Sequence, residues 1–314
     1  MNGMNETKFD NLWVEKYRPK KLSEIVLSES NRAVFEKFDR CKEIPNLLFV
    51  GNAGIGKTSL AKIICKSILE CQYLYINASD ENGIDVIRTK VTNFARTKSF
   101  DGKNKCIILD ETDGLSMDAQ RALRNTMEEY SGMTRFILTA NYNHKIITPL
   151  QSRCQSFDLT PPLKWCVERV YGILQREGVD LPKDETEKLT QFVKSCYPDL
   201  RKCINEIQKN CIGGKVVFDN LIKVKDAFVE SLYNIVKGGL VIKARKKVIE
   251  NETVFNGDYP ELMRSLFNYI HDQDDIPDQK KAEQLVVISE YLYRSAFVVD
   301  QEINFYSCLI AISS

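Results

Sequence analysis

A glycine-rich segment that ends in lysine and threonine is the part of this chain best suited to chemistry. Residues 51–58 read Gly-Asn-Ala-Gly-Ile-Gly-Lys-Thr and match the pattern G-x-x-x-x-G-K-[ST] in full. Such a loop binds phosphate groups, because its glycines let backbone N–H groups approach closely, and a plain glycine-rich turn would not explain the Lys and Thr. Lys57 is expected to neutralise the β- and γ-phosphates, and the Thr58 hydroxyl to reach Mg²⁺. The residues expected to bind the nucleotide here are Gly51, Asn52, Ala53, Gly54, Ile55, Gly56, Lys57, Thr58 and Ser59.

A second group of polar residues predicts that the nucleotide is hydrolysed. Asp110 and Glu111 directly follow an apolar run, and Asn141 follows another. Asp110 is expected to hold Mg²⁺, partly through water, while Glu111 orients the attacking water and Asn141 holds that water or the γ-phosphate. Taken alone, an Asp-Glu pair after a strand could equally begin a solvated loop. Its position after the glycine-rich segment favours catalysis.

The segments that must position these residues alternate between strand and helix patterns. Such alternation predicts an α/β fold with a parallel sheet covered on both faces. A helix is expected from Ser28 to about Arg40, with Ser28 or Ser30 as its N-cap. Strands are expected at about 46–50, 73–77, 106–109, 135–139 and 155–159.

The C-terminal half has helical apolar spacing almost throughout. Thr160-Pro161-Pro162 punctuates the end of the first domain, and Gly213-Gly214 is expected to lead into a linker. Helices are expected at 163–175, 184–195 and 200–208, and again from about 225. We therefore expect three domains: 1–160 for nucleotide binding, 161–224 as a small helical domain, and 225–314 as an all-helical domain.

Composition describes a folded, soluble chain of 314 residues with 43% hydrophobic and 28% charged residues. A signal peptide and a membrane-spanning run are not expected, and the ten cysteines, without C-x-x-C spacing, predict reduced thiols in a cytosolic protein. The net charge is 44 − 43 = +1, so the whole chain has no attractive field for DNA. Residues 84–105, however, carry six basic residues against two acidic ones. A helix over 84–97 would place Arg88, Thr92 and Arg96 in one row beside its apolar face, which fits phosphate contacts or simply a solvated face.

Three short motifs outside the nucleotide loop resemble those of one family. Trp13–Pro19 contains Glu-Lys-Tyr-Arg-Pro, residues 77–80 read Asn-Ala-Ser-Asp, and residues 151–154 read Gln-Ser-Arg-Cys. Together they resemble clamp-loader ATPases of the AAA+ class, above all replication factor C small subunits, over roughly residues 12–210. Finer features resemble the clamp-loader large subunit of T-even-type bacteriophages. They are residues 92–95 together with 99–103, residues 197–202 and, more weakly, residues 302–304.

The resemblance implies an AAA+ P-loop module with a five-stranded parallel sheet, a helical lid domain and an all-α collar domain. It implies ATP and Mg²⁺ as cofactors, with Thr58 and Asp110 at the metal. It implies Arg153 as an arginine finger acting in trans on a neighbouring subunit, and Arg201 as a sensor arginine acting in cis. The residues implied to line the adenine pocket are Tyr17, Arg18, Pro19, Ile25 and Val26.

The resemblance also implies partners. These are the other subunits of a hetero-pentamer (four copies of this chain and one different subunit), a sliding clamp and primer–template DNA, but no membrane. The expected location is the host bacterial cytoplasm for a phage protein, or the nucleus for a eukaryotic one. Arg88, Thr92, Arg96 and Ser116 would face the DNA. Phe100, in a basic turn, would contact the clamp, although a Phe in such a turn often folds back onto the core.

Two readings remain as alternatives: a non-hydrolysing scaffold subunit, and another AAA+ DNA-remodelling ATPase such as a helicase loader or branch-migration motor. The complete set of catalytic residues disfavours the first, and the family motifs disfavour the second. The chain also departs from the family in carrying Asn82 where a basic residue is common. A basic residue at this position could pair with the Glu111 carboxylate and restrain it. Asparagine carries no charge, so such a restraint is in doubt in this chain.

Overall fold

The computed structural model describes residues 12–97, 99, 104–179, 181, 185–218, 223–252, 255 and 257–313. The chain forms two compact units, Met1–Val216 and Val217–Ser314. The expected turn around Phe100 lies outside the described residues.

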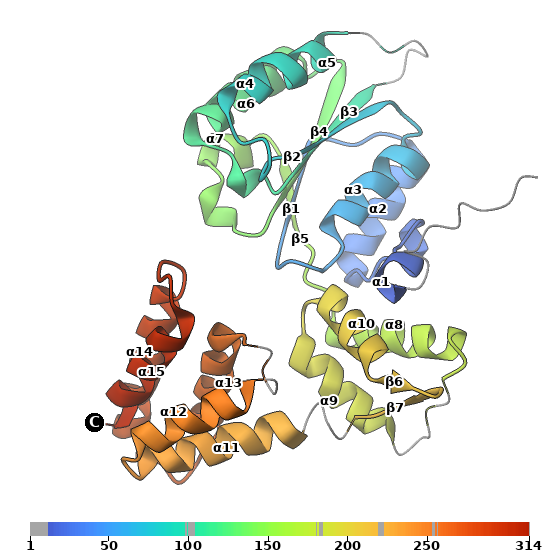
Figure 1. The fold of residues 1–314 in the computed structure, drawn as a ribbon. Coiled ribbons are helices and arrows are strands. Elements are labelled where there is room, and N and C mark those ends of the chain that lie inside the picture. The colour runs from blue at the N-terminus through green and yellow to red at the C-terminus, as the bar shows by residue number, and fades with distance from the viewer. Residues whose placement is uncertain are drawn as a thin grey trace, which may run out of the picture. The chain divides into compact units, whose positions relative to one another are not determined.

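The first unit is built on a five-stranded sheet with the order β2-β3-β4-β1-β5, all strands parallel (Figure 1). The register pairs Val50 with Ala140 and Asn77 with Asp110, so neighbouring strands end at one common edge. The predicted parallel five-stranded sheet is thus confirmed. Its strands are β1 (Leu47–Val50), β2 (Tyr73–Asn77), β3 (Lys105–Asp110), β4 (Thr134–Ala140) and β5 (Gln155–Asp158).

Helices cover both faces of this sheet, because side chains alternate between the faces along each strand. In β1, Leu47 and Phe49 join one core with α2 and α3, whereas Leu48 joins the other core with α6. Figure 1 shows α2 and α3 on one side of the sheet and α4 to α7 on the other. The helices on the two faces are α2 (Glu29–Cys41), α3 (Lys57–Ile63), α4 (Ile84–Val86), α5 (Thr92–Arg96), α6 (Met117–Glu129) and α7 (Thr148–Gln151), and a short helix, α1 (Trp13–Lys16), precedes them in the chain.

Two helices in this layer contain a π-turn that the sequence pattern did not predict. One follows α3 at Ile64–Ile68, and the other, Ile87–Val91, separates α4 from α5. The helix expected at 84–97 is found from Ile84 to Arg96, with a π-turn in its middle. The Thr92 hydroxyl donates to the carbonyl of Ile87, five residues earlier, at 2.9 Å, which supports the wider turn. Such turns are frequent at functional sites.

A small helical subdomain ends the first unit. It contains α8 (Leu163–Arg176), α9 (Thr186–Cys196) and α10 (Leu200–Lys209). Two short antiparallel strands follow, β6 (Cys211–Ile212) and β7 (Lys215–Val216). Gly213-Gly214, expected to lead into a linker, forms the tight turn of this hairpin: both glycines have positive φ, 59° and 77°, as such turns require. Residues 219–222 beyond the hairpin lie outside the described residues.

The second unit is all-helical in its described residues, as predicted. Its core includes Leu232, Leu266, Ile288 and Leu309, which come from different helices. Buried Gln284 accepts a hydrogen bond from the Tyr233 hydroxyl at 3.1 Å and donates to the Ile312 carbonyl at 3.1 Å. The helices are α11 (Lys223–Lys237), α12 (Val241–Glu250), α13 (Tyr259–His271), α14 (Asp278–Arg294) and α15 (Gln301–Ser313).

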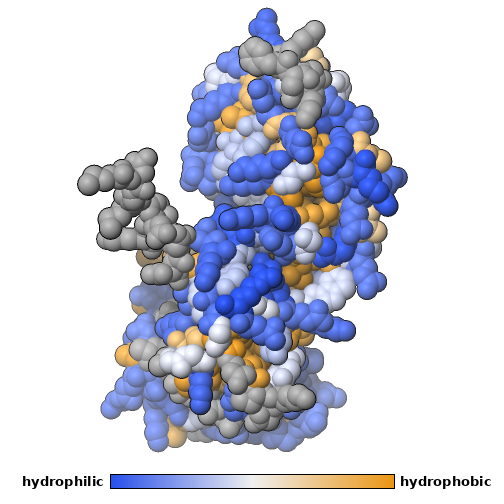
Figure 2. Space-filling model, turned by 90° about the vertical axis from the view of Figure 1, so that its right-hand side faces the viewer, coloured by the Kyte–Doolittle hydropathy of each residue, from blue (hydrophilic) through white to orange (hydrophobic). Residues whose placement is uncertain are grey.

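The surface is mostly polar on the face drawn in Figure 2, where hydrophilic side chains surround smaller hydrophobic areas. In the part of the chain that the structure describes, every helix is too short or too polar to cross a membrane.

Candidate active site at the carboxyl edge of the sheet

The glycine-rich loop links β1 to α3 and needs glycine for two reasons. Gly54 and Gly56 have φ values of 75° and 99°, which L side chains rarely adopt. A Cβ atom added to Gly54 would also lie 1.7 Å from Oδ1 of Asp199. Asp199 is the N-cap of α10, where it accepts a hydrogen bond from the Lys202 amide at 2.9 Å. The helical subdomain therefore reaches directly to the phosphate-binding loop.

Lys57 begins α3, and its ammonium group is enclosed by the loop. It donates to the carbonyls of Gly51 and Asn52 at 2.7 and 2.8 Å, and to Oδ1 of Asn141 at 2.8 Å. Burial lowers the pKa of Lys57, although the carboxylates of Asp110, Asp113 and Glu111 oppose this shift. A phosphate group placed here would favour the charged form of Lys57, so the loop is suited to a polyphosphate.

Asp110, at the end of β3, is buried and hydrogen-bonded on both oxygens. It accepts from the hydroxyls of Thr58 at 2.8 and 2.9 Å, Tyr75 at 2.8 Å and Thr139 at 2.6 Å. Burial, reinforced by the hydrogen bond to Asp110, raises the pKa of Tyr75 well above its usual value. Sequence reasoning missed Tyr75 and Thr139, which approach Asp110 only because β2 and β4 flank β3.

The paired oxygens of Thr58 and Asp110 fit Mg²⁺ that arrives with a nucleotide. Mg²⁺ usually keeps several waters and takes one or two protein oxygens together with phosphate oxygens. Among the described residues, no group of three or more His, Cys, Asp or Glu side chains is arranged to hold a metal. The hydroxyl of Thr58 and the carboxylate of Asp110 supply the one or two protein oxygens that a metal–nucleotide complex needs.

Glu111 follows Asp110 in the left-handed conformation, at φ 56° and ψ 44°. This conformation is uncommon for a residue with a side chain, and such strain tends to occur at functional sites. Its carboxylate Oε2 accepts a hydrogen bond of 2.5 Å from the Ser79 hydroxyl, and its amide donates to Thr139 at 3.0 Å. The partner of the Glu111 carboxylate is thus Ser79, which sequence reasoning did not assign. Asn82 instead offers its backbone carbonyl to the Ser116 amide at 3.1 Å.

The position of Asn141 depends on two polar residues from neighbouring elements, Asp113, which is partly buried, and Gln120, which is buried. Oδ2 of Asp113 accepts from the amides of Asn141 and Tyr142 at 3.2 and 3.1 Å. Gln120, buried in α6, donates to the Lys145 carbonyl at 3.0 Å and accepts from the Ile147 amide at 2.9 Å. These bonds hold the loop from the end of β4 to α7 against the catalytic edge.

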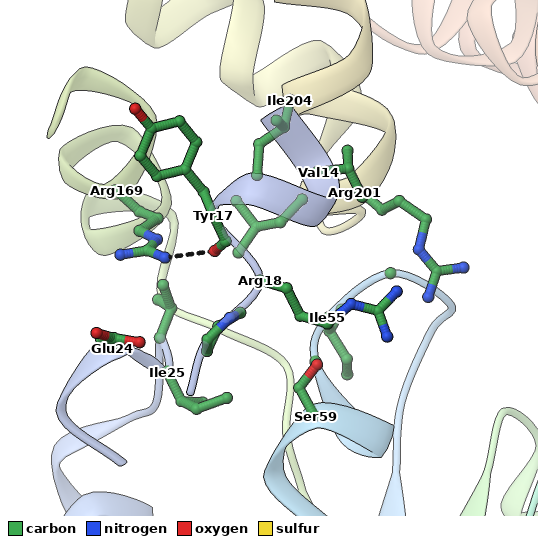
Figure 3. A pocket seen from close by; sticks show the side chains of 15 residues that line it. Val14, Tyr17, Arg18, Glu24, Ile25, Ile55, Ser59, Arg169, Arg201 and Ile204 are labelled. Carbon is green, nitrogen blue, oxygen red and sulfur yellow. Dashed lines mark hydrogen bonds between the residues drawn. The ribbon is translucent and has the colours of Figure 1, made fainter. Parts of the chain in front are cut away.

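A cavity beside the glycine-rich loop contains the residues expected at the adenine. Tyr17, Arg18, Pro19, Ile25 and Val26 line it together with Gly54, Ile55, Gly56 and Ser59. The helical subdomain adds Arg169, Leu200, Arg201 and Ile204. Figure 3 shows Arg18 and Arg201 extending toward the loop, whereas the phenol ring of Tyr17 extends away from it. The structure therefore brings Arg201 and the N-terminal motif together at one cavity.

Arg153, in contrast, does not reach the catalytic edge of its own chain. It donates to the Pro149 carbonyl at 2.8 Å and pairs with Glu128 near the C-terminal end of α6. At about 1.5 Å per residue, Glu128 lies ~16 Å along α6 from Met117, the end of the helix nearer to Glu111. The guanidinium group thus lies at a separate surface, where Glu128 is its partner.

The residues expected at DNA occupy the helices on the α6 side of the sheet. Arg88 and Arg96 are exposed, whereas Thr92 is half-buried and uses its hydroxyl on the π-turn. Ser116 is the N-cap of α6, where its hydroxyl accepts from the Ala119 amide at 3.2 Å. The two arginines can therefore contact phosphates with their full side chains, whereas the hydroxyls of Thr92 and Ser116 already have partners.

Comparisons with known proteins place this site in a family. A family model described as "ATPase family associated with various cellular activities (AAA)" matches residues 47–161. The replication factor C small subunit of Staphylothermus marinus is 35% identical and aligns with 97% of this chain and 95% of its own length. Replication factor C small subunit 1 of Pyrobaculum aerophilum is 37% identical, with 93% of this chain and 91% of its own length aligned. The chain belongs to the replication factor C small-subunit family. As an AAA ATPase of this family, it is an enzyme that hydrolyses ATP.

Solved structures agree with the fold of this replication factor C family member. The Thermotoga maritima RuvB Holliday junction branch migration motor has a TM-score of 0.52 and 17% identity, covering 70% of this chain and 80% of its own. A point variant of the same Thermotoga maritima RuvB has a TM-score of 0.54, also at 17% identity and with the same coverage of both chains. At such low identity the likeness shows the AAA+ fold alone. The family assignment rests on the replication factor C relatives and not on the phage resemblance.

Proposed function

We propose that this chain is the ATP-hydrolysing subunit of a clamp loader, which places a ring-shaped sliding clamp on primer–template DNA during replication. The observation that carries the proposal is the convergence of Lys57, Thr58, Asp110, Glu111 and Asn141 at one sheet edge in a member of the replication factor C family. ATP would bind in the cavity beside the glycine-rich loop. Mg²⁺ would be held by Thr58 and Asp110, partly through water, and would neutralise charge on the phosphates.

Hydrolysis would be completed by a neighbouring subunit. Arg153 lies on a separate surface and pairs there with Glu128. When the nucleotide site of a neighbouring subunit approaches, Arg153 could exchange Glu128 for the γ-phosphate of the neighbour's ATP. An arginine supplied in trans is worth about 10³- to 10⁵-fold in GTPase systems. We infer that Arg153 performs this role, while Arg201 acts on the nucleotide of its own chain.

The second unit supports assembly into an oligomer. Large hydrophobic side chains are exposed along α14, α15 and the turn between them, and exposed apolar patches mark interaction surfaces. These side chains are Val286, Tyr293, Phe297, Val299, Ile303 and Ile310. We propose that residues 225–314 form the collar, that residues 161–224 form the lid, and that four copies of this chain join one different subunit.

Primer–template DNA would contact the exposed arginines Arg88 and Arg96, with Thr92 and Ser116 beside them. Backbone contacts of this kind position a protein on DNA without reading sequence. The clamp would meet the turn after α5, where Phe100 stays a predicted contact. A helicase loader or a branch-migration motor would also bind DNA, so the clamp contact distinguishes a clamp loader from these rivals, whereas ATP hydrolysis distinguishes it from a non-hydrolysing scaffold subunit.

A loading assay tests the proposal. The purified chain, its partner subunits and a labelled clamp are incubated with ATP and circular primed DNA, and the DNA is then separated by gel filtration. We expect the clamp to elute with circular DNA and to be lost after the DNA is linearised, because a closed ring slides off an end. A clamp that binds DNA equally well without this chain would contradict the proposal.

A further inference from the structure

The N-terminal motif, Glu15–Pro19, is fastened to the helical subdomain by side chains far away in the sequence. Glu177, at the C-terminal end of α8, accepts hydrogen bonds from the Tyr17 hydroxyl at 2.5 Å and from Lys16 Nζ at 2.7 Å. Arg169, also on α8, donates to the Tyr17 carbonyl at 2.8 Å, as Figure 3 shows. Just before the motif, the Trp13 amide donates to Gln208 on α10 at 2.9 Å. The motif is thus held by two helices of this subdomain.

Tyr17 is oriented for this attachment rather than for stacking on a nucleotide base. Figure 3 shows its ring pointing away from Ile55 and Ser59, toward the side of the cavity formed by α8. Its neighbour Arg18 extends in the opposite direction, toward the glycine-rich loop. One residue of the motif therefore faces the subdomain, and the next faces the nucleotide site.

The Glu177 carboxylate is well suited to hold Tyr17. Burial raises the pKa of Glu177, but the hydrogen bonds from Lys16 and Tyr17 outweigh burial and leave the pKa below its usual value. The carboxylate is therefore ionised at neutral pH, and hydrogen bonds to ionised groups are about twice as strong as neutral ones. The Lys16 partner is half-exposed, with 47% of its side chain accessible, so its share of the attachment is small.

We propose that Glu177 is a positioning residue for ATP binding, which fixes Tyr17 so that Arg18 and Pro19 stay against the nucleotide cavity. The inference rests on the proposed function, because it assigns the cavity to ATP. The same subdomain carries Arg201 and, through Asp199, approaches Gly54. Attachment of the motif to this subdomain therefore links both walls of the cavity, and losing it would weaken ATP binding without removing any group that acts on the phosphates.

The test compares ATP affinity and turnover in full-length variants. Glu177→Ala and Tyr17→Phe should each weaken ATP binding about 5- to 10-fold, the range of one lost hydrogen bond. The ATP affinity of the double variant should be no lower than that of the single variant with the lower affinity, because each single substitution already removes the Tyr17–Glu177 contact. KM should rise in parallel, while kcat at saturating ATP in the assembled complex changes less than about twofold.

Matched variants separate this role from a merely structural one. Glu177→Gln keeps an oxygen for Tyr17 and should retain most of the ATP affinity, Lys16→Met should cost less than Glu177→Ala, and Gln175→Ala, an exposed change on the same helix, should have no effect. Glu177→Ala and Tyr17→Phe with parental ATP affinity, or with additive losses, would overturn the inference even if their melting temperature falls. Parental ATP affinity in Lys57→Ala would instead show that the proposed nucleotide site itself is wrong.

Discussion

Nζ of Lys57 and Oδ1 of Asn141 are joined by a hydrogen bond of 2.8 Å, although 84 residues separate them in the chain. β1 and β4 are paired, with Val50 beside Ala140, so the glycine-rich loop and Asn141 begin at the same edge of the sheet. Lys57 reaches back along the loop to this edge, where it donates to the Gly51 carbonyl. The residue expected to bind phosphate and the residue expected to hold the attacking water or the γ-phosphate are therefore already in contact. A bound γ-phosphate would lie between groups whose geometry the sheet has fixed.

The lowered pKa of Lys57 predicts that ATP affinity falls as the pH becomes alkaline. The ordinary value is 10.5, and burial lowers it. Below the lowered pKa the ammonium is charged and binds phosphate, and as pH rises through it the charge and the affinity are lost. Bound phosphate raises the pKa again, so ATP binding should take up a proton in this window. Titration of ATP affinity from about neutral pH to about pH 10 checks this, and Lys57→Arg, which stays charged, should flatten the curve. A parental curve as flat as that of Lys57→Arg would contradict the prediction.

Glu111→Gln should separate ATP binding from hydrolysis. The amide keeps the size of the side chain and can still bond to Ser79, but it cannot polarise water as a carboxylate does. We expect turnover in the assembled complex to fall by about 10²-fold or more, with ATP affinity within about threefold of the parent. Single-turnover hydrolysis and equilibrium binding measure the two quantities. If Glu111→Gln hydrolyses ATP at the parental rate, Glu111 does not take part in hydrolysis.

The nucleotide site shows how far local sequence patterns reach. The glycine-rich loop, Asp110, Glu111 and Asn141 were predicted because each follows an apolar strand, and parallel strands share one carboxyl edge. Tyr75 and Thr139 were missed because their contacts with Asp110 depend on the order β2-β3-β4, which periodicity does not give.

Other features escaped prediction for different physical reasons. The π-turn at Ile87–Val91 preserves the apolar spacing of a helix, so no pattern marks it. The Tyr17–Glu177 bond joins residues 160 positions apart and depends on packing between subdomains. At Gly213-Gly214 the glycines signalled a change of direction correctly, but the strands on each side have only two residues, too few for an alternation to be recognised.

The separation of Arg153 from its own catalytic edge predicts complementation between subunits. Complexes made only of Arg153→Ala or only of Glu111→Gln subunits should be nearly inactive. Mixed complexes should recover some turnover, at interfaces where a normal Glu111 faces a normal Arg153. ATPase rates across a series of mixing ratios measure this recovery. If isolated monomers hydrolyse ATP at the rate of the complex, Arg153 does not act in trans.

Arg88 should contribute to DNA binding through a phosphate contact. Arg88→Ala should weaken binding to primed DNA by a similar factor on unrelated sequences and lower the salt slope by about one unit. Lys37→Ala is the matched control, because Lys37 is an exposed cation of α2, on the opposite face of the sheet. Binding isotherms at several salt concentrations give the slopes. Equal salt slopes for the parent and Arg88→Ala would show that Arg88 faces solvent and does not contact a DNA phosphate.

The most direct test of the central claim is the steady-state ATPase rate of the assembled complex with primed DNA, with the clamp, and with both. A clamp loader couples hydrolysis to both ligands, so the rate with both should exceed the sum of the two separate stimulations, and Lys57→Ala should abolish it. A rate that responds to DNA alone, with no added effect of any sliding clamp, would contradict the assignment and favour another AAA+ DNA motor.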